Sequence, residues 1–312
     1  MAMTGNDEII SEGRRGTFSR ALHNPHLIIG FGIIGGMAFA AAVLPPLLGL
    51  DTVAVDPTNR LKAPSAAHLL GTDSFGRDLA ARILAGASTS LRLATSATLL
   101  AAAIGVAVGI LASFFRLLDH VLMRICDGLM AIPALLLALA LAATLGPNFS
   151  NLLIALVVVF VPGIARLVRA QALALRSETF VEASIAMGAG NLHIMVRHIF
   201  PNVLSVLAVQ VTFIFADTIV IEAALSFLGA GVPPPAPSWG NILYDGKAAI
   251  TKAPYMVLFA SAAIVVTVIG LTLIGDGFRD LVDPRMGTHP EAGWVSRLSR
   301  LVLPRIKEGE RE

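Results

Sequence analysis

The sequence predicts an all-α polytopic membrane protein with six transmembrane helices. Hydrophobic residues make up 55% of its 312 residues and charged residues only 14%, and the mean hydropathy is +0.77. A composition this apolar is not that of a water-soluble domain. Several runs contain no Asp, Glu, Lys or Arg and reach the roughly 20 residues that a helix needs to cross a hydrocarbon core. An even number of crossings places both chain ends on one side.

The apolar runs place the crossings along the chain. The first run, Leu27 to Leu50, follows basic residues but is too long for the apolar part of a signal peptide, so we interpret it as an uncleaved anchor. Residues 128–165 suffice for two crossings, with a turn at Gly146-Pro147-Asn148. The other crossings are expected at residues 93–115, 203–229 and 253–275.

Lys and Arg are distributed unevenly between the two sides that this topology defines. Sixteen of the 23 lie on the side of the termini. Because positively charged loops are retained in the cytoplasm, both termini are predicted to be cytoplasmic. The basic residues form no continuous stripe, which argues against a nucleic-acid partner. Cys126 is the only cysteine, so a disulfide within the chain is impossible.

This topology divides the chain into five parts. They are a cytoplasmic N-tail (1–26), an anchor helix (27–50), an extracytoplasmic segment (51–92), a transmembrane core (93–275) with a cytoplasmic loop (171–202), and a cytoplasmic C-tail (276–312).

The polar interruption at residues 176–201 has helical patterns of its own. Val181 and Ile185 share one helical face, and Gly188 lies in a glycine-rich break. Asn191 is expected to cap a second helix, which Pro201 is expected to end. Two interpretations remain from the pattern alone. The helices either lie against lipid headgroups or form a docking element for a cytoplasmic partner.

A resemblance favours the docking interpretation. Glu182-Ala183, Gly188 and Pro201 resemble the EAA loop in permease subunits of binding-protein-dependent ABC importers. The sequence departs from that pattern at Ser184, His198 and Phe200, and its ending at 197–202 is similar to the form in the peptide and nickel branch. The resemblance implies that Glu182, Ala183, Gly188 and Pro201 belong to a loop that enters a groove on an ATPase subunit and transmits its closure to the transmembrane helices.

Three further stretches are similar to dipeptide and oligopeptide permease C subunits. They are residues 68–78, Glu222 with 225–229 and 238–240, and residues 275–285. The resemblance implies a type I importer transmembrane domain in the bacterial inner membrane. It also implies a non-catalytic subunit that forms half of a pathway for di- or oligopeptides, with nickel chelates or another small solute as the alternative cargo.

The same resemblance implies the partners. They are a second permease subunit, two ATP-binding subunits that hold ATP and magnesium, an extracytoplasmic substrate-binding protein and the lipid bilayer. No cofactor is expected in this chain itself. Residues 240–247 fall short of a phosphate-binding loop, because five residues separate the glycines and Ala248 follows the lysine.

Charged residues within and beside the spans are the candidate path and outer residues. A charge central in a spanning helix costs roughly 2.5–3.5 kcal/mol on insertion scales, so Asp217 and Glu222 should face the bundle or water. Both are candidates for the substrate pathway, although they lie about 140° apart around the helix. The alternative for each is a structural polar contact to a neighbouring helix or to the partner subunit. Asp73, Arg77 and Asp78 are candidates for contact with the binding protein or the second permease. Their alternative role is a structured turn with a helix capped by Thr72 or Asp73. Asp78 and Arg82 also have the spacing of an ion pair along a helix.

Other signals concern helix packing. Gly105 and Gly109 have the spacing of close helix contacts in lipid. Pro133 and Pro162 are expected to kink their helices, and Trp239 is expected at the membrane interface.

Two other classes compete with a permease. An intramembrane serine enzyme would need a nucleophile motif and a histidine base within the spans, and an aspartyl enzyme would need a second carboxylate opposite Asp217. The sequence supplies neither arrangement. A self-contained channel or secondary transporter would leave the EAA-like loop without a role.

Overall fold

The computed structural model describes residues 22–47, 54–233 and 235–282, and in this part of the chain the regular elements are all helical. Among the described residues, five helices are long and apolar enough to cross a membrane, or six when one bent pair is taken as a single crossing. The predicted all-α membrane fold is therefore confirmed. Most of the two expected tails, 1–26 and 276–312, lies outside the described residues, as do residues 48–53 of the first outer segment.

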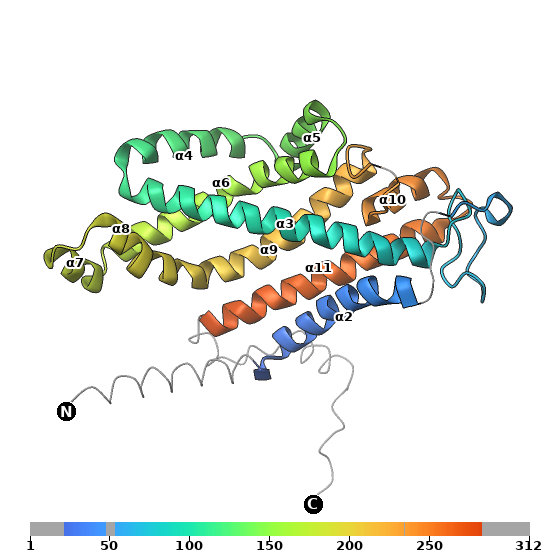
Figure 1. The fold of residues 1–312 in the computed structure, drawn as a ribbon, viewed down its shortest axis with the longest axis horizontal. Coiled ribbons are helices and arrows are strands. Elements are labelled where there is room, and N and C mark those ends of the chain that lie inside the picture. Colours follow the sequence, from blue (N-terminus) through green and yellow to red (C-terminus); the bar gives the residue numbers. More distant parts are fainter. Residues whose placement is uncertain (1–21, 48–53, 234, 283–312) are drawn as a thin grey trace, which may run out of the picture.

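The long helices lie side by side in one bundle (Figure 1). The helices are α2 (Pro25–Leu47), α3 (Leu79–Phe114), α4 (Arg116–Met130), α5 (Ala134–Leu145), α6 (Phe149–Arg176), α7 (Thr179–Ala186), α8 (Asn191–Ile194), α9 (Phe200–Phe227), α10 (Trp239–Ala248) and α11 (Pro254–Val282). Helices α7 and α8 lie at one end of the bundle, and α10 lies at the other with residues 54–78. We refer to these as the α7 end and the α10 end.

Helix α3 begins earlier than its charge-free run suggests. It starts at Leu79 instead of Leu93, and the Asp78 side chain caps it by accepting a hydrogen bond from the Ala81 N–H. The charged residue Arg82 therefore lies inside the helix, where it is buried. A search for runs without charged residues misses a helical turn whose charged residue is neutralised by partners far away in the sequence.

The third crossing is broken. Helix α5 has 12 residues, a length of about 18 Å, which is too short to cross a bilayer alone. It meets α4 at a bend of 94°, and Pro133 lies directly before α5. Proline lacks an N–H and disfavours the helical conformation in the residue before it, which explains the break. Residues 116–127, which lie between the expected crossings at 93–115 and 128–165, belong to α4.

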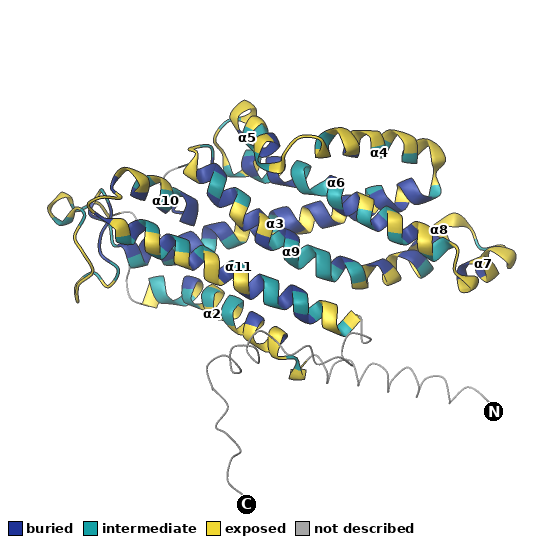
Figure 2. Ribbon diagram, turned by 180° about the vertical axis from the view of Figure 1, so that it is seen from behind, coloured by how far each residue is buried: buried dark blue, intermediate teal, exposed yellow. Residues whose placement is uncertain are grey.

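Glycines bring α3 and α6 into close contact. A Cβ atom on Gly105 would lie 2.6 Å from Cβ of Ile164, and one on Gly109 would lie 2.6 Å from the Ala165 carbonyl oxygen. Only a hydrogen atom fits at these positions, so the predicted packing role is confirmed within the chain. The buried residues concentrate along these facing helices (Figure 2).

The described start of α2 and the described end of α11 lie side by side (Figure 1). Gly277 of α11 packs against Leu27 of α2, and Nδ1 of His26 lies 3.3 Å from a carboxylate oxygen of Asp280. These contacts account for two positions of the stretch at 275–280, the small residue Gly277 and the charged residue Asp280. The last part of that stretch, 283–285, lies outside the described residues.

Pro201 does not end a helix, contrary to the sequence prediction. It occupies the first turn of α9, where a missing N–H is tolerated. A π-helical turn at Met195–Ile199 joins α8 to α9, so that residues from Asn191 to Phe227 run as one continuous span. The residue that caps α8 is Gly190, and Asn191 is already inside the helix.

Candidate functional site

The first candidate site is a projecting hairpin formed by α7, α8 and the turn between them, residues 177–199, which we call the α7 hairpin. Helix α7 ends in a turn at Gly188, whose φ of +86° is left-handed. The Ala189 N–H donates to the Ser184 carbonyl at 3.0 Å, and the Gly188 N–H donates to the Ile185 carbonyl at 2.9 Å. This pair of bonds is the Schellman arrangement that closes a helix at a glycine.

One face of the hairpin is buried and fixes its position. Val181, Ile194 and Ile199 are buried in a cluster with residues of α3, α6 and α9. The Ser184 hydroxyl donates to the Phe180 carbonyl at 2.9 Å and lies 3.2 Å from Nε2 of His198. Two residues that depart from the EAA pattern therefore contact each other across the hairpin.

The other face is open. Met187 is 82% exposed and Leu192 is 74% exposed, and both lie beside the turn. Glu182 and Ala183 on α7 are also exposed, and so are Gly188 in the turn and Pro201 at the start of α9. Figure 2 shows this exposed end of the bundle. Large exposed apolar side chains beside a turn form a surface for another protein or for lipid.

The left-handed turn makes a matched pair of substitutions informative. Gly188→Ala should destabilise the turn by roughly 1–2 kcal/mol, because a Cβ disfavours this backbone conformation. Gly190→Ala should have little effect, because the φ of Gly190 is −74° and a Cβ there meets open space. Hydrogen exchange at the amides of residues 184–190 measures the difference. Equal exchange rates in the two variants would contradict this account of the turn.

The second candidate site is Asp217 on α9. Its side chain is exposed, and it forms no ion pair or side-chain hydrogen bond within the described part of the chain. It lies ten residues, or about 15 Å, before the end of α9, in the middle of an apolar span. An exposed carboxylate at this depth requires water or another subunit beside it.

Glu222 is placed differently. It is completely buried, with its carboxylate oxygens 3.1 Å from the Ser90 hydroxyl and 2.8 Å from the Ser226 hydroxyl. The neighbouring Trp239 is also buried inside the bundle, and its ring N–H donates to the Ile83 carbonyl at 3.1 Å. Glu222 therefore joins α9 to α3 in this conformation and does not face an open path.

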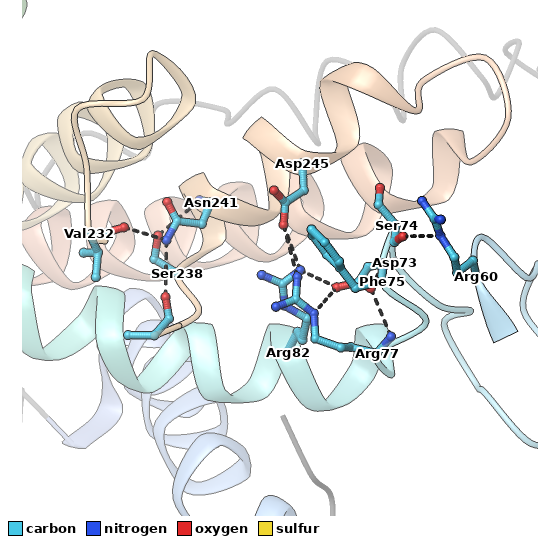
Figure 3. A network of polar contacts seen from close by, with 11 residues as sticks. Arg60, Asp73, Ser74, Phe75, Arg77, Arg82, Val232, Ser238, Asn241 and Asp245 are labelled. Atoms are coloured by element: carbon cyan, nitrogen blue, oxygen red, sulfur yellow. Dashed lines mark hydrogen bonds and ion pairs between the residues drawn. The ribbon is translucent and has the colours of Figure 1, made fainter. Parts of the chain in front are cut away.

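The third candidate site is an outer ion-pair network of Asp73, Arg77, Arg82 and Asp245 at the α10 end (Figure 3). The Asp73 carboxylate accepts from Nε of Arg77 and from Nη1 of Arg82, both at 2.6 Å. Arg82 also donates to Asp245 at 3.0 Å. Asp73 and Arg82 are 0% and 3% exposed, so this is a buried network.

The network corrects the expected pairing of Asp78 with Arg82. Asp78 instead caps α3 and lies 3.0 Å from Nδ1 of His68. Asp73 and most of Arg77 are turned inward, while Leu69 and Phe75 of the same loop are exposed. This burial favours a role for the charged residues in shaping the loop.

Sequence reasoning missed Asp245 and the helix that carries it. Helix α10 is short, and its charged residues at 245 and 247 make its sequence resemble that of a loop. The one available signal is Ser238, whose hydroxyl accepts from the Asn241 N–H three residues later in the manner of a helix cap.

The bundle, with a rigid exposed hairpin at one end, defines a transmembrane subunit of the type I importer class. Residues 101–288 match the model of the family described as "Binding-protein-dependent transport system inner membrane component". The chain belongs to this family, and it is a multi-pass inner-membrane protein that works with other components of an ABC importer.

Relatives cover most of the chain. A peptide transport system permease protein of Brucella abortus is 42% identical over 86% of this chain and 91% of its own. The dipeptide transport system permease protein DppC of Alkalihalophilus pseudofirmus is 41% identical over 87% of this chain and 90% of its own. The glutathione transport system permease protein GsiD of Pectobacterium atrosepticum is 37% identical over 86% of this chain and 90% of its own.

A solved structure has the same fold. The inward-facing MetNI methionine ABC transporter matches with a TM-score of 0.54 at 22% identity. The match covers 67% of this chain and 97% of that chain. It supports the type I importer fold.

Proposed function

We propose that this chain forms half of the translocation path of an ATP-driven importer for di- or oligopeptides. The α7 hairpin carries the proposal, because it is a rigid, exposed element whose Glu182, Ala183 and Gly188 match the loop that takes up ATPase movement in this family. The names of the relatives reported above favour peptide-like cargo over nickel chelates.

The proposal assigns partners to the two ends of the bundle. The α7 end faces the cytoplasm and docks one of two ATP-binding subunits, which hold ATP and magnesium. The α10 end faces outward, where the loop shaped by Asp73, Arg77 and Asp78 presents Leu69 and Phe75 to the substrate-binding protein. A second permease subunit completes the path. The chain itself has no catalytic role in this scheme, and both termini are cytoplasmic.

Reconstitution tests the function directly. The chain should copurify with a second permease and ATPases, and a binding protein loaded with a dipeptide should stimulate ATP hydrolysis by the complex in vesicles. Glutathione and a nickel chelate serve as the comparison ligands. Stimulation by the nickel chelate without stimulation by any peptide would overturn the proposed cargo.

Asp217 is proposed as a path residue that meets the cationic amino terminus of a peptide. Asp217→Asn removes the charge but keeps the shape, so transport at a fixed rate of ATP hydrolysis should fall about fivefold, as expected for a partly hydrated ion pair. Ser205→Ala, an exposed polar position on the same helix, is the control. Normal transport of every peptide by Asp217→Asn would remove Asp217 from the path.

A further inference from the structure

A charged groove of about 640 Å³ lies between α4 and α6, apart from the three sites described above. Its charged lining residues are Asp119, Arg124, Asp127, Arg166 and Arg169. The groove is near the α7 end of both helices, because α4 begins and α6 ends there.

The charged residues fall into a fixed pair and a loose pair. Arg169 donates to both carboxylate oxygens of Asp119, at 2.5 and 2.7 Å, and this bidentate pair fixes α4 against α6. Arg166 lies 3.7 Å from Asp127, and these side chains are 53% and 57% exposed. Arg124 is exposed and forms no ion pair within the described residues. The loose pair and Arg124 therefore remain available to a ligand.

Helix α4 separates this charged surface from an apolar one. Leu117, Val121 and Ile125 are exposed at intervals of four residues and form one stripe. Asp127 lies about 120° around the helix from the middle of that stripe, and Arg124 lies about 60° from it, at the edge of the stripe. An apolar exposed stripe suits lipid, whereas charges on a helix of a membrane bundle need water or a polar partner. The groove is thus positioned to face an aqueous space while the stripe faces lipid.

We propose that the α4–α6 groove lines the inward-open part of the translocation path and binds the charged ends of a peptide. The carboxylate binds Arg166 and Arg124, and the ammonium group binds Asp127. This proposal rests on the proposed function, since it takes a peptide as the cargo. It adds a second contact point to Asp217, closer to the α7 end.

The ion pairs also explain how such a contact releases its ligand. A bound peptide breaks the existing Arg166–Asp127 pair and makes three contacts, with Arg166, Arg124 and Asp127; because these side chains are exposed to water, each contact contributes little and the net gain in free energy is small. Weak binding of this kind suits a path, because a transported solute must leave each contact as readily as it enters.

Thiol labelling tests whether the groove is aqueous and binds peptide. The complete importer, in inside-out vesicles without nucleotide, carries Cys126→Ala and either Ala170→Cys in the groove or Val121→Cys on the apolar stripe. A charged, membrane-impermeant methanethiosulfonate should react with Ala170→Cys at least about tenfold faster, because only a hydrated thiol ionises readily. A millimolar dipeptide should slow the reaction, and Arg166→Gln should remove this protection. An unreactive Ala170→Cys, or one that the dipeptide does not protect, would overturn the proposal.

Transport separates this inference from the proposed function. Arg166→Gln and Asp127→Asn should each lower the amount of peptide moved per ATP hydrolysed about fivefold. Arg166→Lys should retain part of it, and Arg116→Gln, at the start of α4 but outside the groove, should match the wild type. If the wild-type complex moves no peptide, the proposed function fails. If it moves peptide and both groove variants equal it, only the groove proposal fails.

Discussion

Replacing Glu182 with lysine should abolish most coupled transport while leaving the chain folded in the membrane. Glu182 is exposed in the first turn of α7 and makes no side-chain hydrogen bond or ion pair within the described residues. The substitution therefore changes folding stability little, by less than about 1 kcal/mol. Reversing a charge inside a protein interface costs about 2–5 kcal/mol, which weakens ATPase docking by at least tenfold. Copurification of the ATPases and peptide uptake measure the loss.

A nearby charge reversal distinguishes a specific contact from general repulsion. Glu178→Lys changes the same charge one helical turn earlier, at the residue that precedes α7. It should weaken coupling less than Glu182→Lys, and Glu182→Gln should lie between Glu182→Lys and the wild type. Equal effects of the two lysine variants would assign the loss to net charge instead of to a contact made by Glu182.

The features that could be predicted from the sequence have local causes. The break after α7 follows from the backbone freedom of Gly188, and the apolar runs of α2 and α11 follow from the length of a bilayer crossing. The close contact of α3 with α6 follows from the four-residue spacing of Gly105 and Gly109. Each of these signals lies within a single segment, so the sequence of that segment alone predicts the feature.

The features that were missed depend on partners far apart in the chain. Arg82 resembles a loop residue until Asp73 and Asp245 are seen to neutralise it. Asp245 is separated from Arg82 by 163 positions, and no spacing rule connects them. Pro201 is ambiguous for a different reason, because proline is tolerated at a helix start and disruptive further along. The continuity of α8 with α9 decides between a Pro201 that ends one helix and a Pro201 that begins the next.

Two of the stretches that resemble peptide permeases lie together at the α10 end. They are residues 68–78 and the group formed by Glu222, 225–229 and 238–240. Glu222 contacts Ser90 and Ser226, and Gly240 packs so closely on Ser226 that a Cβ there would overlap it. The outer ion-pair network ties the start of α3 to α10 nearby. These buried contacts hold α3, α9 and α10 together at this end of the bundle.

Replacing Asp73 with alanine should produce the largest loss of stability among single substitutions at the α10 end. Its carboxylate is fully buried and accepts four hydrogen bonds, two from arginines and two from the backbone N–H groups of Phe75 and Arg77. Removing it leaves Arg82 buried with Asp245 as its remaining carboxylate partner. Breaking a buried ion pair from one side costs about 3–5 kcal/mol. Denaturation of the purified chain by SDS in mixed micelles measures the change.

Two further variants make this result specific to the buried charge. Asp56→Ala removes a partly exposed carboxylate from the same loop, where its partners are Thr58 and Asn59, and should cost much less stability than Asp73→Ala. The double variant Asp73→Leu with Arg82→Met removes both charges and should recover at least about half of the loss, because buried apolar residues replace an ion pair with little penalty. If Asp73→Ala is as stable as the wild type, Asp245 alone satisfies Arg82, and the network does not hold the outer loop on α10.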